Sequence, residues 1–228
     1  MGFDKITITL ATIPSREKML EEVVKSLSPQ ADMVCVFLNG YEKVPEFLHA
    51  TPNVVVKQSQ DYDDLADNGK FYWEVGGYHL TVDDDINYPT DYVSRLVEKI
   101  DFYERRAVVG VHGFVFIPPI KSFYKSRNVF HYKRALAEDI KVDVIGTGTM
   151  GYHTSAIRFP LELFKTKRMA DIWVGLSCLE KGVPRYCINR KDRWLSSMGT
   201  SDGSDIYTTF HANDNAQTQL VTGVQWTR

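Results

Sequence analysis

The order of apolar segments in the first hundred residues most strongly restricts the fold of this 228-residue chain. Met33–Leu38 is apolar at every position, which is typical of a parallel strand covered on both faces. Ile6–Ala11, Val54–Val56 and Tyr78–Val82 are further short runs of the kind that form strands. Lys18–Leu27, between the first two runs, has the spacing of an amphipathic helix. This alternation predicts an α/β domain with a doubly wound, mostly parallel sheet.

The second half of the chain has a less regular pattern. We expect one strand over Val108–Ile117, short strands on either side of Gly146–Thr149, and a helix that begins near Asp171. Arg185–Ile188 is the last expected strand. The tail from Leu195 is rich in Ser, Thr, Asp, Asn and Gly, so a loop-like conformation is expected there.

The composition limits the class of protein. A formal net charge of −2 disfavours a nucleic-acid-binding protein, and no apolar stretch approaches the roughly 20 residues of a transmembrane helix. The N-terminal residues do not have the layout of a secretory signal. Three widely spaced cysteines in apolar contexts are typical of reduced thiols, so we expect a cytoplasmic protein. A single domain over residues 1–228 is the simplest organisation, and no feature indicates an oligomeric state.

Three adjacent carboxylates, Asp83, Asp84 and Asp85, follow the run Tyr78–Val82. Adjacent anions repel one another, and a divalent cation is the simplest way to balance their charge. In open α/β sheets, ligands bind just beyond the carboxyl ends of the strands. Carboxylates suit hard cations, so the triplet indicates a site for Mn²⁺ or Mg²⁺. The alternative is a solvated acidic turn.

Several blocks of sequence, together with the acidic triplet, resemble the GT-A glycosyltransferases, and in particular the bacterial heparosan N-acetylglucosaminyltransferase and related capsule-type transferases. The blocks are Phe37–Pro45, Gly69–Phe71, Thr81–Val93, Val109–Gly113 and Gly146–Thr149. The resemblance implies one GT-A type domain with a Rossmann-like sheet and helices on both faces. Residues 1–105 would bind the nucleotide sugar, and residues 106–228 would form an irregular acceptor-binding half.

The same resemblance implies the reaction and its partners. The protein would move a hexose or N-acetylhexosamine from a UDP-sugar to an oligosaccharide or glycan acceptor, with retention of configuration. Mn²⁺ or Mg²⁺ would be the cofactor, and the protein could lie at the periphery of a membrane-associated glycan assembly.

The quoted blocks, the wider resemblance to GT-A enzymes and the residue types together indicate the site residues. Asp83, Asp85 and His211 would bind the metal, and Asp171 would be the catalytic carboxylate, although an Asp there could also cap the helix. The donor-binding set would be Thr12, Ile13, Pro14, Arg16, Asn39, Asp67, Gly69, Lys70, Asp83, Asp84 and Asp85. The sugar or acceptor pocket would contain His112, Gly146, Thr147 and Trp194. Lys70 and Arg16 could instead be ordinary surface charges.

Two other functions remain open at this stage. A nucleotidyltransferase that makes sugar nucleotides has the same alternating architecture. Such enzymes usually carry a glycine-rich basic loop after the first strand, whereas the segment Thr12–Arg16 contains no glycine. A catalytically inactive glycan-binding GT-A domain is the non-enzyme alternative, and the complete acidic triplet argues against it.

Overall fold

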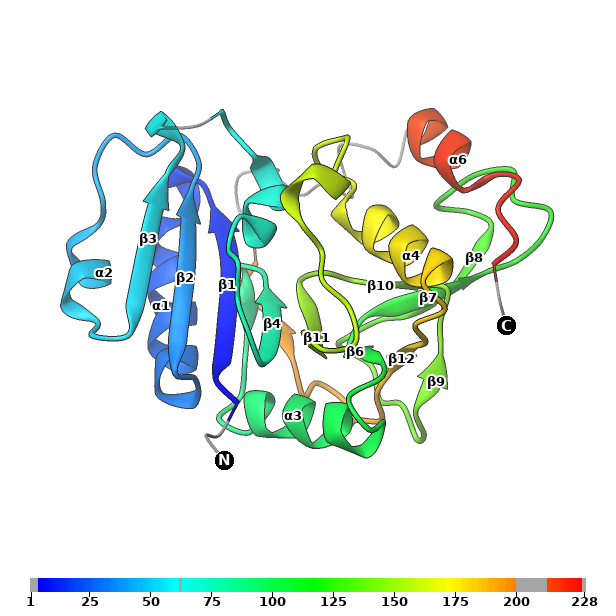
Figure 1. The fold of residues 1–228 in the computed structure, drawn as a ribbon, viewed down its shortest axis with the longest axis horizontal. Helices are drawn as coiled ribbons and strands as arrows, with labels where there is room; N and C mark the ends of the chain where they lie inside the picture. The colour runs from blue at the N-terminus through cyan, green and yellow to red at the C-terminus, as the bar shows by residue number, and fades with distance from the viewer. Residues whose placement is uncertain (1–3, 62, 200–212, 227–228) are drawn as a thin grey trace.

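The computed structural model describes residues 4–61, 63–199 and 213–226, and in this part of the chain an eight-stranded sheet forms the centre (Figure 1). The sheet order is β3-β2-β1-β4-β11-β6-β12-β9. Its strands are β1 (Ile6–Thr12), β2 (Met33–Leu38), β3 (Val54–Gln58), β4 (Tyr78–Val82), β6 (Val108–Gly110), β9 (Ile140–Lys141), β11 (Thr149–His153) and β12 (Arg185–Cys187). The four strands β3, β2, β1 and β4 are parallel, and β11 runs antiparallel to β4 and β6. The predicted α/β fold with a mostly parallel sheet is therefore confirmed.

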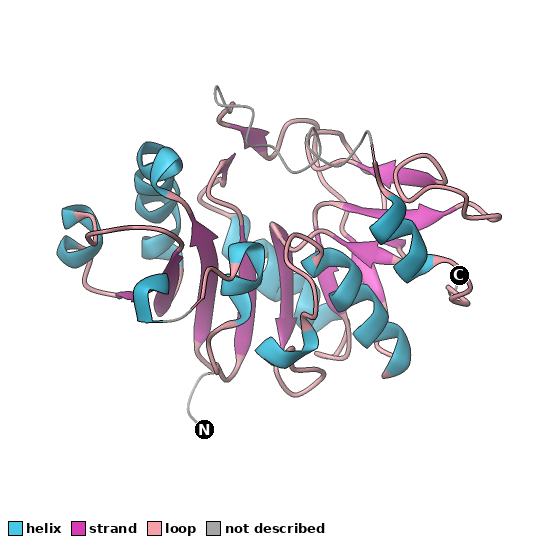
Figure 2. Ribbon diagram, turned by 90° about the horizontal axis from the view of Figure 1, so that it is seen from above, coloured by secondary structure: helices cyan, strands magenta, loops and turns pink. Residues whose placement is uncertain are grey.

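Helices cover both faces of this sheet, as the view from above shows (Figure 2). They are α1 (Glu17–Leu27), α2 (Glu46–Ala50), α3 (Tyr92–Phe102), α4 (Ala170–Glu180) and α6 (Asn215–Val221), with a 3₁₀ helix at Ala66–Phe71. None of the helices in the described ranges is both long and apolar enough to cross a membrane.

Alternation along the central strands divides the core into two faces. Leu80 of β4 belongs to the apolar cluster that includes α1 and α3. Met150 and Tyr152 of β11 belong to the cluster that includes Val174 and Cys178 of α4. Successive side chains of a strand point to opposite faces, so one sheet supports both helical layers. The sheet thereby fixes α4, whose first turn contributes to the site described below.

The strand expected over 108–117 is in fact two strands in different sheets, which corrects the sequence-based expectation. β6 belongs to the large sheet, whereas β7 (Gly113–Phe116) pairs with β8 (Arg127–Phe130) and β10 (Val144–Ile145) in a three-stranded sheet. The chain changes sheets at Val111 and His112. Their backbone N–H groups donate to Thr149, the first to the carbonyl oxygen at 3.1 Å and the second to Oγ1 at 3.0 Å.

Two further expectations for the C-terminal part of the chain were wrong. β12 is not the last strand, because β13 (Ser196–Ser197) pairs with β5 (Ile86–Asn87). The tail is not loop-like throughout, because α6 packs against α4 and buries Gln217 and Val221. Asp214 immediately before α6 accepts a hydrogen bond from the Thr218 amide at 2.8 Å through its carbonyl, which closes the first helical turn.

Candidate functional site

A cavity of about 630 Å³ lies at the edge of the sheet where β1 and β4 end. This volume is within the range of small-molecule sites, and the position is where open α/β sheets bind ligands. Its lining at this edge comes from the turn after β1, the 3₁₀ helix, the turn after β4, the turn before β11 and the start of α4. The residues are Arg16, Asp67, Lys70, Asp83, Asp85, Ile86, Gly146, Thr147, Gly148, Thr149, Arg168, Met169, Ala170, Asp171 and Ile172.

The three carboxylates of the acidic triplet have different environments. Asp83 and Asp85 line the cavity, and their side chains are 39% and 27% exposed. Asp84 is buried and accepts a hydrogen bond from Arg16 Nη1 at 2.8 Å. The same Nη1 lies 3.3 Å from Asp85 Oδ2. The Lys70 ammonium pairs with Asp83 Oδ1. Asp84 thus fixes Arg16 beside the site, while the two flanking carboxylates face the cavity.

The loop Gly146–Thr149 packs directly against the acidic triplet. A Cβ on Gly148 would overlap Oδ2 of Asp83, so only glycine permits this close approach. The Tyr88 hydroxyl donates a hydrogen bond to the Gly148 carbonyl at 2.6 Å and accepts one from the Asp83 amide at 2.9 Å. These contacts join two of the blocks that carry the family resemblance.

Asp171 is on the first turn of α4 and faces the same loop. The amide and the hydroxyl of Thr147 both donate to Asp171 Oδ1, each at 2.7 Å. The N-cap of α4 is Met169, so Asp171 is not the capping residue. Asp67 instead accepts a hydrogen bond from Ala170, the first residue of α4, at 3.2 Å, and one from Arg168, just before the helix, at 2.5 Å. Asp171 is thereby available to the cavity as a positioned carboxylate.

Burial and charge set the protonation of these groups. Burial, together with Asp83 and Asp84, raises the pKa of Asp85 to about 6, although Arg16 and Lys70 oppose this. Burial also raises the pKa of Asp171. For Lys70, burial acts against the charged form, but Asp83, Asp67 and Asp171 outweigh it and raise the pKa. The pKa of His112 is lowered to about 3, mainly by burial, so this imidazole is neutral near pH 7.

The residues at this edge fit a hard divalent cation. Burial is the largest cause of the raised pKa of Asp85, and the neighbouring carboxylates Asp83 and Asp84 add to it. Asp83 and Asp85 both line the cavity and offer oxygen ligands there. Mg²⁺ is usually held by one or two carboxylates together with substrate phosphates and water. In the described ranges no group of three or more His, Cys, Asp or Glu side chains is arranged to hold a metal. A cation here would therefore depend on the ligand for part of its coordination.

Other predicted site residues are near the cavity but do not line it. Thr12, Ile13, Pro14, Asn39 and Gly69 are in this group. The Asn39 amide oxygen accepts the Leu65 amide at 3.1 Å, and its nitrogen donates to Ala66, so Asn39 holds the loop before Asp67. Gly69 leaves room for the Phe37 ring, which a Cβ would approach to 2.7 Å.

Trp194 and His211 complete the predicted set. Trp194 does not line the cavity, because its indole N–H donates to Asp91 Oδ1 at 3.0 Å and its ring lies 5.9 Å from that of Tyr92. His211 is outside the described residues. His112, Gly146 and Thr147 do line the cavity as expected.

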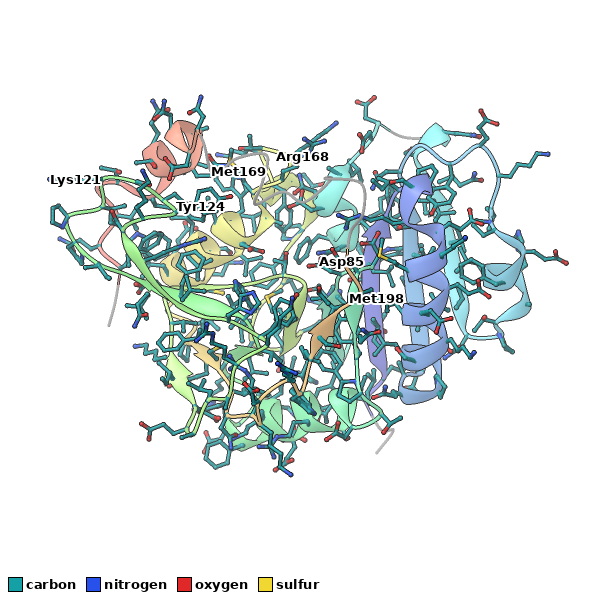
Figure 3. The ribbon with its side chains drawn as sticks, turned by 180° about the vertical axis from the view of Figure 1, so that it is seen from behind. Asp85, Lys121, Tyr124, Arg168, Met169 and Met198 are labelled. Atoms are coloured by element: carbon teal, nitrogen blue, oxygen red, sulfur yellow. The ribbon has the colours of Figure 1, made fainter. Side chains whose placement is uncertain are left out.

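The cavity also includes residues that the sequence did not single out for the site. Figure 3 places Arg168 and Met169 above Asp85, with Tyr124 to one side. Arg168, Met169 and Tyr124 line the cavity, as do Phe114, Phe123, Ile172 and Gln217. These residues belong to no chemical motif. The one available signal was the adjacency of Arg168–Met169 to the predicted helix start near Asp171.

The parallel strand order and the charged cavity at the strand ends define a Rossmann-like α/β domain. Solved structures with a similar fold include S. aureus TarS 1-349, at 18% identity and a TM-score of 0.50. That match covers 82% of this chain and 59% of the TarS fragment. A second TarS structure has 16% identity and a TM-score of 0.51, covering 95% of this chain and 42% of that one.

A nucleotidyl transferase from Methanothermobacter thermautotroptrophicus, Mth528, is also similar. It has 14% identity and a TM-score of 0.51, and the match covers 81% of this chain and 86% of that one. No family model and no curated protein matches the chain. At these identities the likeness shows the fold alone.

Proposed function

We propose that this protein is a glycosyltransferase that moves a hexose or N-acetylhexosamine from a UDP-sugar to a glycan acceptor with a divalent cation. The observation that supports it most is that Asp83, paired with Lys70, and Asp85, beside Arg16, line one cavity together with the positioned carboxylate of Asp171. The resemblance of the quoted blocks to heparosan-type transferases supports UDP as the nucleotide.

The basic side chains have a clear part in this proposal. When the bond between the sugar and the nucleoside diphosphate breaks, negative charge develops on the departing phosphate. A bound divalent cation would stabilise that charge as a Lewis acid. Lys70 is almost fully buried and remains charged, so it can supply a fixed positive charge to a phosphate oxygen. Arg16, held by Asp84, keeps a second cation beside Asp85.

Asp171 is the proposed catalytic carboxylate. The Thr147 amide and hydroxyl both donate to Oδ1, so Thr147 fixes the orientation of the side chain. A carboxylate held in this way can stabilise positive charge on the sugar ring or orient the acceptor hydroxyl. Retention of configuration is proposed from the family resemblance.

A nucleotidyltransferase is the second candidate, because the fold is also similar to that of Mth528. The two reactions release different products. A glycosyltransferase releases UDP from a UDP-sugar. A nucleotidyltransferase joins a sugar phosphate to a nucleoside triphosphate, and the triphosphate releases pyrophosphate.

Product analysis tests the proposal. The protein is incubated with Mn²⁺ and either UDP-glucose or UDP-N-acetylglucosamine, or with UTP and the matching sugar 1-phosphate. We expect slow UDP release from a UDP-sugar without added acceptor, abolished by Asp85→Asn. Pyrophosphate release from UTP with no UDP release from either UDP-sugar would favour the second candidate instead.

A further inference from the structure

One end of the cavity is lined by aromatic and apolar side chains, with the guanidinium of Arg127 from β8 among them. Its walls come from β7, the turn at 123–124, α4 and α6: Phe114, Phe123, Tyr124, Met169, Ile172 and Gln217. Phe114, Phe123, Met169 and Ile172 belong to one apolar cluster with Val221. The Arg127 guanidinium carbon lies 4.4, 4.7 and 4.6 Å from the ring centres of Phe114, Phe123 and Tyr124, so this end carries one cation stacked on aromatic rings.

The helix α6 holds Gln217 firmly against this end of the cavity. Asp214 Oδ2 accepts the Tyr124 amide at 2.9 Å and the Ser122 hydroxyl at 2.6 Å. Thr218 Oγ1 accepts the Phe123 amide at 2.9 Å. Gln217 shares the buried face of α6 with Val221, four residues on. Gln217 therefore has a defined position rather than that of a mobile surface side chain.

The amide oxygen of Gln217 has no protein partner. Gln217 is only 2% exposed, it lines the cavity, and its Oε1 is a buried acceptor without a hydrogen bond. Nδ1 of His112 is a second buried polar atom of the cavity lining without a partner. Native proteins rarely leave such groups unsatisfied, so each is a candidate to be satisfied by a ligand. Oε1 can only accept, which requires a donor such as a hydroxyl on that ligand.

We propose that this end of the cavity binds the pyranose ring of a sugar. Gln217 Oε1 would accept a hydrogen bond from a ring hydroxyl, and the side chains of Tyr124 and Met169 would pack against the apolar face of the ring. Tyr124 packs against the apolar cluster that includes Met169, and both residues, labelled in Figure 3, line the cavity. An amide acceptor beside aromatic rings suits the hydroxyl groups and the apolar face of a sugar, and Lys70 and Arg16 beside the acidic triplet suit phosphate.

This inference rests on the proposed function, since the ring would belong to the donor or to the acceptor of the transfer. The test uses Gln217→Met, which keeps the length of the side chain and removes its amide. Gln219→Met, at an exposed position of the same helix, is the matched control. Calorimetry with Mn²⁺ compares UDP with UDP-glucose and UDP-N-acetylglucosamine. Saturation-transfer NMR measures cellobiose and chitobiose without nucleotide.

We expect Gln217→Met to bind UDP within twofold of wild type and to keep its melting temperature. A donor subsite predicts at least a tenfold loss of affinity for a UDP-sugar relative to UDP. An acceptor subsite predicts loss of saturation transfer to a disaccharide. Gln219→Met should behave as wild type in every measurement.

Several outcomes would overturn the subsite. One is that Gln217→Met and Gln219→Met behave identically in both calorimetry and saturation-transfer NMR. Another is that Gln217→Met has a lower melting temperature and loses UDP and UDP-sugar affinity equally. A wild-type protein that binds neither disaccharide, and binds UDP-sugars no differently from UDP, also overturns it. If wild type binds a disaccharide through Gln217 but no UDP, the subsite stands and the proposed function fails.

Discussion

Replacing Asp85 with Asn should stabilise the metal-free protein. The pKa of Asp85 is raised from its ordinary value of 3.8 to about 6, chiefly by burial and by Asp83 and Asp84. One pKa unit corresponds to about 1.4 kcal/mol, so the ionised carboxylate costs the fold about 3 kcal/mol at neutral pH. A neutral Asn avoids this cost. For a domain of this size the gain corresponds to a rise of roughly 6–12 °C in melting temperature.

The stability advantage of Asp85→Asn should depend on pH in a defined direction. Between about pH 4 and pH 6 the folded protein binds more protons at Asp85 than the unfolded chain does, so wild-type stability falls as the pH rises. The advantage of Asp85→Asn should therefore be largest above pH 6 and mostly disappear below pH 4. Urea unfolding followed by tryptophan fluorescence, in chelator, measures both limits. Asp63→Asn, an exposed carboxylate, is the control and should change stability by less than about 0.5 kcal/mol.

Two results would refute this reasoning. Asp85→Asn could be no more stable than wild type at pH 7.5, which would mean that the ionised carboxylate is not penalised in the fold. It could also show the same gain at pH 4 and pH 7.5, which would assign the effect to packing rather than charge.

Three further predictions concern the same cavity. Gly148→Ala must displace the Asp83 carboxylate, so calorimetry should show at least a tenfold loss of Mn²⁺-dependent UDP affinity, and unchanged affinity would contradict the packing. Asp171→Asn and Asp171→Ser should keep UDP affinity but lower kcat at least about 100-fold, roughly 2.7 kcal/mol; near wild-type turnover would make Asp171 purely structural. Burial lowers the pKa of His112 to about 3, so wild-type stability should fall relative to His112→Asn by about 1.4 kcal/mol per pH unit below about pH 6; parallel urea profiles would disprove this.

Local patterns in the sequence were enough to predict much of the sheet. β2 is a continuous apolar run and β4 is a short, largely apolar one, and the acidic triplet directly after β4 indicated which edge of the sheet would carry the site. The apolar segment after Asp171 was likewise enough to place this residue near the start of a helix. The blocks around Asp83 and Gly148 were identified separately, and the structure brings them into contact.

The remaining features depend on contacts between distant parts of the chain. The change of sheet at Val111 and His112 is set by hydrogen bonds to Thr149, which no local pattern encodes. Trp194 is directed away from the cavity by Asp91. Gln217 is buried beside the cavity because α6 packs against α4. A single amide in a seven-residue helix has no sequence signature that would predict this.

Titration of UDP into the wild-type protein tests the central claim most directly. We predict that UDP binds in Mn²⁺ at least tenfold more tightly than in chelator, and more tightly than GDP or CMP. Asp85→Asn should remove the Mn²⁺-dependent part of the affinity while the protein stays folded. UDP affinity that is the same in Mn²⁺ and in chelator, or tighter binding of GDP, would contradict a metal-dependent UDP-sugar site at Asp83 and Asp85.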